Sequence, residues 1–445
     1  YGQANTHKEF HVGHLRNVCL GIAVVNLSRA VGFEVVAVNY PGDIGAHVAK
    51  CLWAFKKFHA GETPPANRGK YLGEIYAEAT RRIEEDESLK TEVAEVQRKL
   101  EARDPEWDAL WSETRQWSID EINAIFAELG TTFDRVYYES EVEERGKTLV
   151  RELLEKKIVT VGDGGALIVD LEDEKSGIFL VLKSDGSALY STKELALAEL
   201  KFKEYDVAAS IHIVDTRQAL YFKQFFATLK RMGFDKKMVH LAYEFVTLKE
   251  GAMSSRKGNI VAYEDFRDDM LRRTITETGK RHEDWNQKKV ADVARTIALG
   301  AMKFTMLKQD IGKPIVFDVE QALAFEGFTG PYVQYAHARM SSILEKAGGV
   351  PSSAKGSDDP AEFAVIRMVA DFPDVVRAAA EAYRPEHLAQ YLFDLAQAAN
   401  GFYRDVPVLG ALADDRDRRL VIVSALQSTL RRGLALLGIR APEEM

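Results

Sequence analysis

The chain has 445 residues, more than one hydrophobic core can organise, so its length predicts about three domains. Hydrophobic residues make up 46% and charged residues 29%, which excludes a disordered chain, and no apolar run of about 20 residues could span a membrane. The net charge of −9 excludes no nucleic-acid partner, because a local basic face is enough to bind one. Cys19 and Cys51 lie far apart, so we expect neither structural zinc nor a disulfide framework, and we expect a cytoplasmic protein.

Residues 1–40 predict the start of an α/β fold. Apolar residues recur every three or four positions from Gly13 to Val31, which predicts a helix. Residues 33–40 form an apolar run that predicts a buried strand, and Pro-Gly-Asp after it predicts a turn. This order is typical of a βαβ unit, in which nucleotides bind at the carboxyl ends of the strands.

The middle of the chain predicts a helical segment inserted into that fold. Residues 62–157 are rich in Glu, Lys and Arg at helical spacing. Strand patterns then return in four runs, at 166–171, 178–183, 207–214 and 238–246. Helices are predicted between them, from about Thr192 and over 217–231.

After Gly258 the spacing predicts helices almost to the end, packed as a bundle. We therefore expect an α/β, Rossmann-like nucleotide-binding domain that is split by a helical insertion and followed by an all-α bundle. The expected segments are the first half of the nucleotide-binding domain, the insertion, the second half, a helical linker and the bundle, at 1–61, 62–165, 166–260, 261–320 and 321–445.

Two histidines and a glycine stand together where the first helix is expected to begin. His11, Gly13 and His14 follow Lys8 closely. A glycine there lets a nucleotide approach the backbone, the helix N-terminus offers N–H groups to phosphates, and imidazoles can donate to phosphate oxygens. By itself the pattern fits a phosphate site and a pair of surface or capping histidines about equally well.

A second candidate is the loop at 251–259, which follows the last predicted strand. It combines backbone donors with hydroxyl and cationic side chains, namely Ser254, Ser255, Arg256 and Lys257. Such a loop suits an anion, for example a departing pyrophosphate. Taken alone, it is more simply an exposed, solvated loop.

Together the two motifs resemble the paired signatures of class I aminoacyl-tRNA synthetases. The sequence HVGH at 11–14 matches the first signature, and MSS at 253–255 matches part of the second, with Ala252 in place of its first lysine. Five stretches are similar to arginyl-tRNA synthetases, in order and along essentially the whole chain: NTHKEFHVGHLRN, YSTKELALA, MSSRKGN, GPYVQYAHAR and LLGIRAPEEM. In that family a lysine before the first signature serves the ATP phosphates, and Lys8 stands at its position.

The resemblance implies an arginine–tRNA ligase, which forms arginyl-adenylate from arginine and ATP and passes arginine to the 3′ end of tRNA(Arg). Catalytic roles are implied for Lys8, His11, His14, Ser254, Ser255, Arg256 and Lys257. ATP contacts are implied for His11, Gly13, His14, His240 and Met253. Mg²⁺ is expected with ATP, and the family suggests a monomer.

For arginine, the resemblance implies a carboxylate four residues after a tyrosine, which selects Glu194 after Tyr190. One helical turn places both on one face, and a carboxylate is the natural partner of a planar guanidinium. The family usually has aspartate there, so Glu194 keeps the charge and adds a methylene; the alternative is a solvated helix glutamate. Gly42, Asp43 and Gly45 match a family turn that we expect to be structural. The other implied arginine contacts are Gln3, Asn5, Lys8, His11 and Gln218.

The helical bundle would then be the anticodon-binding domain. The implied tRNA contacts are Tyr332, Gln334, Tyr335, Arg339 and Met445, with tyrosines stacking on unpaired bases or, alternatively, filling the bundle core. The family also has an N-terminal domain that contacts the tRNA body, which we expect to be absent from a chain that begins at Tyr1. Two rival functions stay open: a nucleotidyltransferase, which would not need the bundle, and a non-catalytic RNA-binding relative, which should have lost Lys8, His11 or His14.

Overall fold

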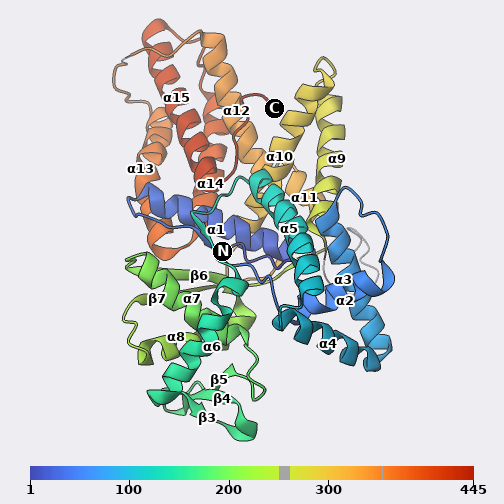
Figure 1. Ribbon diagram of the computed structural model, residues 1–445. Coiled ribbons are helices and arrows are strands. Elements are labelled where there is room, and N and C mark those ends of the chain that lie inside the picture. The colour runs from blue at the N-terminus through green and yellow to red at the C-terminus, as the bar shows by residue number, and fades with distance from the viewer. Residues whose placement is uncertain (250–260, 353) are drawn as a thin grey trace. The chain divides into compact units, whose positions relative to one another are not determined.

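Figure 1 shows the computed structural model, which describes residues 1–249, 261–352 and 354–445. Helices predominate, and the strands of these residues form four small sheets. Within the same residues no helix is both long and apolar enough to cross a lipid bilayer.

The chain divides into two compact units that do not follow sequence order. The first unit consists of Tyr1–Phe10 and Val36–Tyr243, and the second of His11–Val35 and Glu244–Met445. The first helix of the chain therefore belongs to the same unit as its C-terminal half.

Four helices form the early part of the first unit: α2 (Ala46–Phe58), α3 (Arg68–Glu85), α4 (Lys90–Glu101) and α5 (Pro105–Glu128). They share an apolar core that includes the buried Trp107. The side chains of Asn67 and Asp104 accept backbone N–H groups from the first turns of α3 and α5, and Pro105 fits the first position of α5. α3, α4 and α5 lie within the segment predicted as a helical insertion, whereas α2 precedes that segment.

A short parallel pair of strands lies on either side of those helices in the sequence. β1 (Val38–Asn39) pairs with β2 (Arg135–Val136), and α6 (Glu139–Glu155) follows. The strand predicted over 33–40 is thus much shorter than expected, because its partner offers only two residues and Phe33 is exposed. The insertion also contains a strand, β2, which its charged helical pattern did not indicate.

The rest of the first unit matches the strand and helix predictions within a few residues. β3 (Thr160–Val161), β4 (Leu167–Asp170) and β5 (Ile178–Leu182) form an antiparallel sheet. The chain continues through α7 (Tyr190–Glu204), β6 (Ala209–Asp215), α8 (Ala219–Arg231) and β7 (Lys237–Tyr243). β6 and β7 are parallel along their full length, which makes β6–α8–β7 a βαβ unit, and buried Phe222 and Phe225 of α8 join its core. Four 3₁₀ turns complete the unit, at Glu87–Leu89, Asp163–Gly165, Glu172–Glu174 and Thr216–Gln218.

The second unit is almost entirely helical. Its helices are α1 (Val12–Ala30), α9 (Tyr263–Arg281), α10 (Gln287–Leu307), α11 (Val319–Leu323), α12 (Gly330–Ala347), α13 (Pro360–Ala382), α14 (Pro385–Asp405) and α15 (Ala413–Leu436). α12 to α15 pack against one another as the predicted bundle (Figure 1). β8 (Val246–Leu248) and β9 (Ile315–Phe317) form a short parallel pair, and β9 departs from the helical prediction made for the chain after Gly258.

α1 is buried on almost every side, although a surface helix would bury only one stripe. It packs against α10, α13 and α15 of its own unit. Gly438, just after α15, has φ +71°, and a Cβ there would lie 2.5 Å from Ile22 Cγ2, so only glycine fits this contact with α1. α1 is thus a core element of the C-terminal half.

Candidate active site

His11 and His14 cap the N-terminus of α1 reciprocally. The Nδ1 atom of His11 accepts the backbone N–H of Gly13 (3.1 Å) and of His14 (3.4 Å), and the Nδ1 atom of His14 accepts that of His11 (3.2 Å). The rings stack with centroids 3.7 Å apart. Because each Nδ1 is an acceptor, a neutral ring carries its proton on Nε2, where it can donate to an anion.

Gly13 makes room for this arrangement. A Cβ at Gly13 would lie 2.9 Å from His11 Cε1 and 3.0 Å from His11 Nδ1, too close for a side chain. The glycine of the motif therefore fits the folded-back imidazole, a packing reason that adds to the expected approach of a nucleotide.

Arg16, one turn further along α1, is an important residue that the sequence interpretation missed. Its side chain is fully buried and donates to five backbone carbonyls of the second unit, those of Glu244, Phe245, Asp310, Ile311 and Lys313. These bonds hold the first turns of α1, and with them the two histidines, against the strand region that starts at β8. The available signal was a charged residue among the apolar positions of the first half of the helix.

Lys8 belongs to the first unit, where it follows a buried, hydrogen-bonded histidine. The neighbouring His7 is fully buried; its ring nitrogens bond to Thr6 Oγ1 and Thr114 Oγ1, both at 2.9 Å. Burial lowers the pKa of His7 to about 3, so that ring is neutral. The half-buried Lys8 ammonium lies 5.0 Å from the centroid of the Tyr76 ring, and Lys50 lies 5.3 Å from the same centroid.

The turn at 42–45 is held in place from both sides. Asn5 Oδ1 accepts the N–H of Gly42 (3.1 Å), and a Cβ on Gly42 would lie 2.7 Å from that oxygen. The buried Asp43 carboxylate accepts from Arg115 Nε (2.7 Å) and from the backbone and hydroxyl of Ser140 (2.9 and 2.6 Å). These contacts support the expected structural role of the turn. Gln3, with φ 48°, donates its N–H to Asn39 Oδ1.

Tyr190 and Glu194 lie on successive turns at the start of α7, as their spacing predicts. Hydroxyls of the same turn dock the helix on β5: Ser191 Oγ donates to the Leu180 carbonyl (2.6 Å), and Thr192 Oγ1 donates to that of Val181. Glu194 is only 2% exposed, which contradicts the alternative of a solvated helix glutamate.

The Glu194 carboxylate is incompletely paired. Its Oε2 has no hydrogen-bond partner among the described residues. Burial raises the pKa of Glu194, while the positive charge of Lys201 and the Tyr190 hydroxyl oppose that rise. The adjacent Lys193 is already engaged in a buried ion pair with Glu139. A buried carboxylate with an unused oxygen is costly, and a cationic ligand would relieve that cost.

The two remaining predicted residues of the first unit have different surroundings. Gln218 is exposed and immediately precedes α8. His240, on β7, bonds through Nε2 to the Val214 carbonyl (3.0 Å), and its ring stacks on Phe222 with centroids 4.4 Å apart. Burial lowers the pKa of His240, which is therefore a neutral ring on an apolar platform. Met253, Ser254, Ser255, Arg256 and Lys257 lie outside the described residues.

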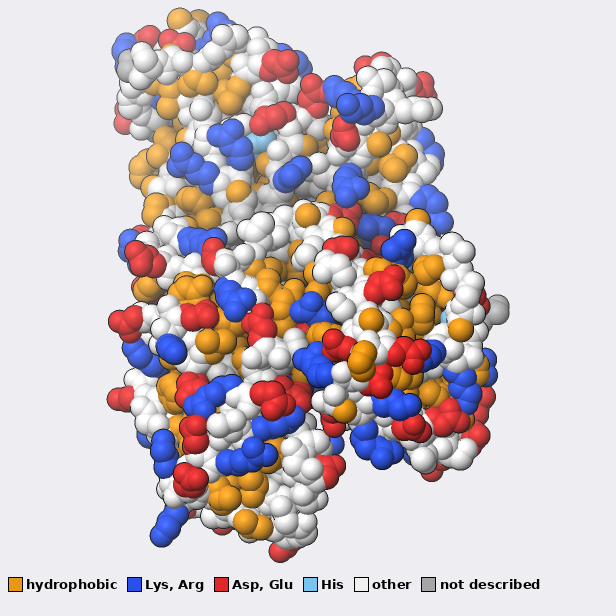
Figure 2. Space-filling model, in the orientation of Figure 1, with side chains coloured by type: hydrophobic (Ala, Val, Ile, Leu, Met, Phe, Trp, Pro, Cys, Tyr) orange, Lys and Arg blue, Asp and Glu red, His pale blue; other side chains and the backbone are white. Residues whose placement is uncertain are grey.

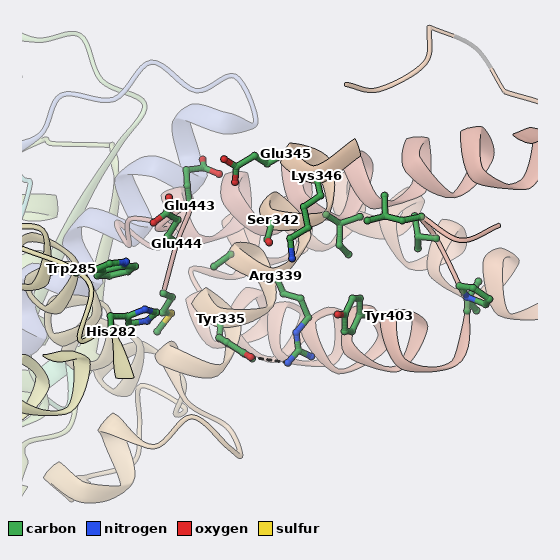
Figure 3. A pocket seen from close by; sticks show the side chains of 17 residues that line it. His282, Trp285, Tyr335, Arg339, Ser342, Glu345, Lys346, Tyr403, Glu443 and Glu444 are labelled. Carbon is green, nitrogen blue, oxygen red and sulfur yellow. Dashed lines mark hydrogen bonds between the residues drawn. The ribbon is translucent and has the colours of Figure 1, made fainter. Parts of the chain in front are cut away.

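A separate cavity of about 710 Å³ lies in the second unit, between α12, the loop after α14 and the last residues of the chain (Figure 3). Arg339 donates to the Tyr335 hydroxyl (2.9 Å) and to Asn400 Oδ1 (2.8 Å), and its guanidinium lies 4.6 and 5.0 Å from the ring centroids of Tyr335 and Tyr403. His282 and Trp285 stack at 3.8 Å and also line the cavity. Aromatic faces beside a cation are typical of a site for an unstacked base.

The cavity gathers three of the five predicted tRNA contacts, Tyr335, Arg339 and Met445. Gln334 is fully buried instead, and its amide donates to the Thr296 and Arg440 carbonyls at 3.2 and 2.8 Å. The Tyr332 ring packs against Phe393 within the bundle. Helical spacing explains the division, because adjacent positions of α12 point to different sides.

The cavity of the second unit is not distinguished by an excess of positive charge. Figure 2 shows acidic and basic side chains interspersed over the visible face of the molecule. The cavity lining itself combines Arg339 and Lys346 with Glu345, Glu443 and Glu444. Recognition here would therefore depend on stacking and shape more than on net positive charge.

Comparisons with known proteins cover the whole chain. Residues 1–319 match the family "tRNA synthetases class I (R), catalytic domain", and residues 333–445 match the "DALR anticodon binding domain". The arginine–tRNA ligase of Bdellovibrio bacteriovorus is 39% identical over 459 residues, an alignment that spans 100% of this chain and 79% of that protein. That of Bacteroides fragilis is 34% identical, over 100% of this chain and 80% of its own length.

Solved structures agree with the sequence comparisons. The arginyl-tRNA synthetase of Thermus thermophilus superposes with a TM-score of 0.86 at 31% identity, covering 100% of this chain and 82% of that one. The methionyl-tRNA synthetase of Mycobacterium tuberculosis, at 13% identity, a TM-score of 0.61 and coverage of 99% and 91%, shares the fold alone.

Proposed function

This chain belongs to the arginyl-tRNA synthetases, and from that membership we propose how its residues divide the work of an arginine–tRNA ligase. In the first step the carboxylate of arginine attacks the α-phosphorus of ATP and pyrophosphate leaves. In the second, a hydroxyl of the terminal ribose of tRNA attacks the carbonyl carbon of the arginyl-adenylate, and AMP leaves. Neither step requires a protein nucleophile, so orientation and charge stabilisation supply the rate.

Arginine binding is assigned to the start of α7. The observation that carries this assignment is the buried Glu194 carboxylate, whose Oε2 has no partner among the described residues. A guanidinium offers a planar fork of N–H donors that suits such an oxygen pair. Tyr190 borders the carboxylate, and we assign the remaining arginine contacts to Gln3, Asn5, Lys8, His11 and Gln218.

The ATP phosphates are assigned to cationic and N–H donors near the start of the chain. Lys8 would supply a full positive charge, and the Nε2–H groups of His11 and His14 would donate to oxygens as charge develops on them. Ser254, Ser255, Arg256 and Lys257 are proposed to assist pyrophosphate departure. His240 is proposed on the adenosine side, where its ring, stacked on Phe222, offers an apolar surface, and Gly13 and Met253 are proposed as further ATP contacts.

We propose Mg²⁺ as the companion of ATP. Across the described parts of the chain, no three His, Cys, Asp or Glu side chains are grouped so that they could hold a metal ion. The phosphates of ATP would therefore carry most of its coordination.

The tRNA anticodon is assigned to the helical bundle. The cavity lined by Tyr335, Arg339 and Met445 has aromatic and cationic surfaces for unpaired bases, to which Trp285 and Tyr403 add further faces. Gln334 and Tyr332 would act indirectly, by fixing α12 in the bundle. We also propose a monomer acting in the cytoplasm, a compartment consistent with the free, buried thiols of Cys19 and Cys51.

The decisive experiment is pyrophosphate exchange into ATP with each of the twenty amino acids, with and without total tRNA. Exchange with arginine alone supports the assignment, and a requirement for added tRNA would match the family closely. Exchange with another amino acid would leave the fold unaffected and contradict the substrate.

A further inference from the structure

Two tyrosines near Glu194 also have a buried oxygen without a hydrogen-bond partner among the described residues. The hydroxyl oxygens of Tyr40 and Tyr221 are sealed from solvent and, like Glu194 Oε2, have no hydrogen-bond partner among the described residues. The ring of Tyr190 links them: its centroid lies 6.4 Å from that of Tyr40 and 5.3 Å from that of Tyr221. The four side chains come from the residue that follows β1, from α7 and from α8 of the first unit.

Unpaired polar atoms rarely gather in a protein interior. Most buried polar side-chain atoms have a partner, because an unpaired one loses its bonds to water and gains nothing. The negative charge of Glu194 also acts on the tyrosines, since, after burial, it is the next cause that raises the pKa of Tyr40 and of Tyr221. Both hydroxyls therefore stay protonated and neutral beside the carboxylate.

A guanidinium would bind to this group of acceptors better than other cations would. It carries five N–H donors in one plane, and a single carboxylate binds only one edge of that fork. Neutral phenol oxygens can accept the remaining N–H groups without adding negative charge that would attract any cation. The tyrosine rings can also lie along the flat face of the ligand, whereas a lysine ammonium is compact and has only three donors.

We propose that Tyr40 and Tyr221 are specificity-determining residues of the arginine site, whose hydroxyl oxygens accept the guanidinium N–H groups that Glu194 leaves unpaired. The proposal rests on the assignment of Glu194 as the guanidinium ligand. It explains how a glutamate works where the family usually has aspartate: the two hydroxyls complete the set of acceptors around a carboxylate that projects one methylene further.

The test uses Tyr40→Phe and Tyr221→Phe, which keep the rings and remove only the hydroxyls. The arginine KM should rise about tenfold in each variant, the value for one hydrogen bond to a charged group, with the ATP KM unchanged. The unfolding temperature without arginine should stay the same or rise, because each hydroxyl is unpaired in the free protein. The readout is arginine-dependent pyrophosphate exchange with tRNA present, together with thermal unfolding.

Tyr137→Phe is the matched control. Tyr137 is buried in the same unit, but its hydroxyl is paired with Glu204, so loss of that hydroxyl should lower the unfolding temperature and leave the arginine KM unchanged. A wild-type arginine KM in both Tyr40→Phe and Tyr221→Phe would overturn the proposal. If Glu194→Ala also kept a wild-type arginine KM, the assignment of Glu194 itself would fail; if only the tyrosine variants did, the failure would be confined to this inference.

Discussion

The guanidinium of Arg16 donates a 2.5 Å hydrogen bond to the backbone carbonyl of Glu244, a residue 228 positions further along the chain. Four other carbonyls accept from the same side chain at 3.0–3.4 Å. Backbone oxygens thus supply the partial negative charge that this buried cation needs. The position of the first helix is thereby tied to the start of the C-terminal half.

Replacing Arg16 should destabilise the protein strongly. Arg16→Leu removes five hydrogen bonds from a buried charged donor, including those to the Glu244 and Lys313 carbonyls, and should lower the free energy of unfolding by about 3 kcal/mol or more. Arg29→Leu, at an exposed position of the same helix, should change it by less than about 1 kcal/mol. Denaturant unfolding of the two variants would measure the difference, and equal losses would contradict the role given to Arg16.

Lys8 and Lys50 provide a paired test of phosphate binding. Both ammonium groups lie over the Tyr76 ring, at 5.0 and 5.3 Å, but only Lys8 is assigned to ATP. Lys8→Ala should slow adenylate formation by about 100-fold or more, because it removes a charge from the reacting phosphates. Lys50→Ala should leave the rate nearly unchanged. A near-wild-type rate for Lys8→Ala in pyrophosphate exchange would transfer the role to Arg256 or Lys257.

Glu194 should be required for arginine and not for ATP. Glu194→Ala should lower kcat/KM for arginine by about 100-fold or more, since the buried guanidinium would lose its counter-charge. Glu194→Gln keeps the volume and should be nearly as defective, because its neutral amide cannot balance the cation. Steady-state kinetics with each substrate varied in turn would separate the two effects; equal losses for arginine and ATP would point to misfolding instead.

Protonation of Glu362 in acid should lower the stability of the bundle. Burial raises the pKa of this carboxyl, but hydrogen bonds from Arg418, Ser357 and Arg419 outweigh it and lower the pKa to about 2. Because the folded value lies below that of the unfolded chain, the stabilisation is present above about pH 4.5 and is lost as pH falls towards 2. The unfolding-temperature gap between wild type and Glu362→Gln should therefore narrow from pH 6 to pH 3, and a constant gap would contradict the linkage.

Loss of the Arg339 side chain should weaken the binding of tRNA more than that of arginine or ATP. Arg339→Ala removes the cation held between Tyr335 and Tyr403 and should raise the KM for tRNA about tenfold, the scale of one base-stacking contact. Arg377→Ala, at an exposed position on α13, is the control and should leave that KM unchanged. Aminoacylation kinetics would report both, and an altered arginine KM in Arg339→Ala would argue against a role confined to tRNA.

Local sequence patterns predicted the helices well, because a helix depends mainly on residues that are close together in the sequence. The helix expected from Gly13 to Val31 occurs at Val12–Ala30, and four residues of spacing correctly placed Tyr190 and Glu194 on one helical face. Features that depend on distant partners were not predictable. The length of β1 is limited by β2, almost 100 residues later. The hydrogen bonds of Arg16 depend on carbonyls beyond residue 243. The sequence around α12 did not indicate that Gln334 faces the core and Tyr335 the cavity.

The burial of α1 among α10, α13 and α15 has a consequence for biosynthesis. The ribosome releases α1 hundreds of residues before the helices that cover it, since α10 begins at Gln287 and α15 at Ala413. Until then its apolar sides face water or a chaperone, since no single stripe of it can be hidden on its own. The HVGH motif therefore reaches its final surroundings only after α15 has been synthesised, and a premature stop before α15 would deprive α1 of part of its packing.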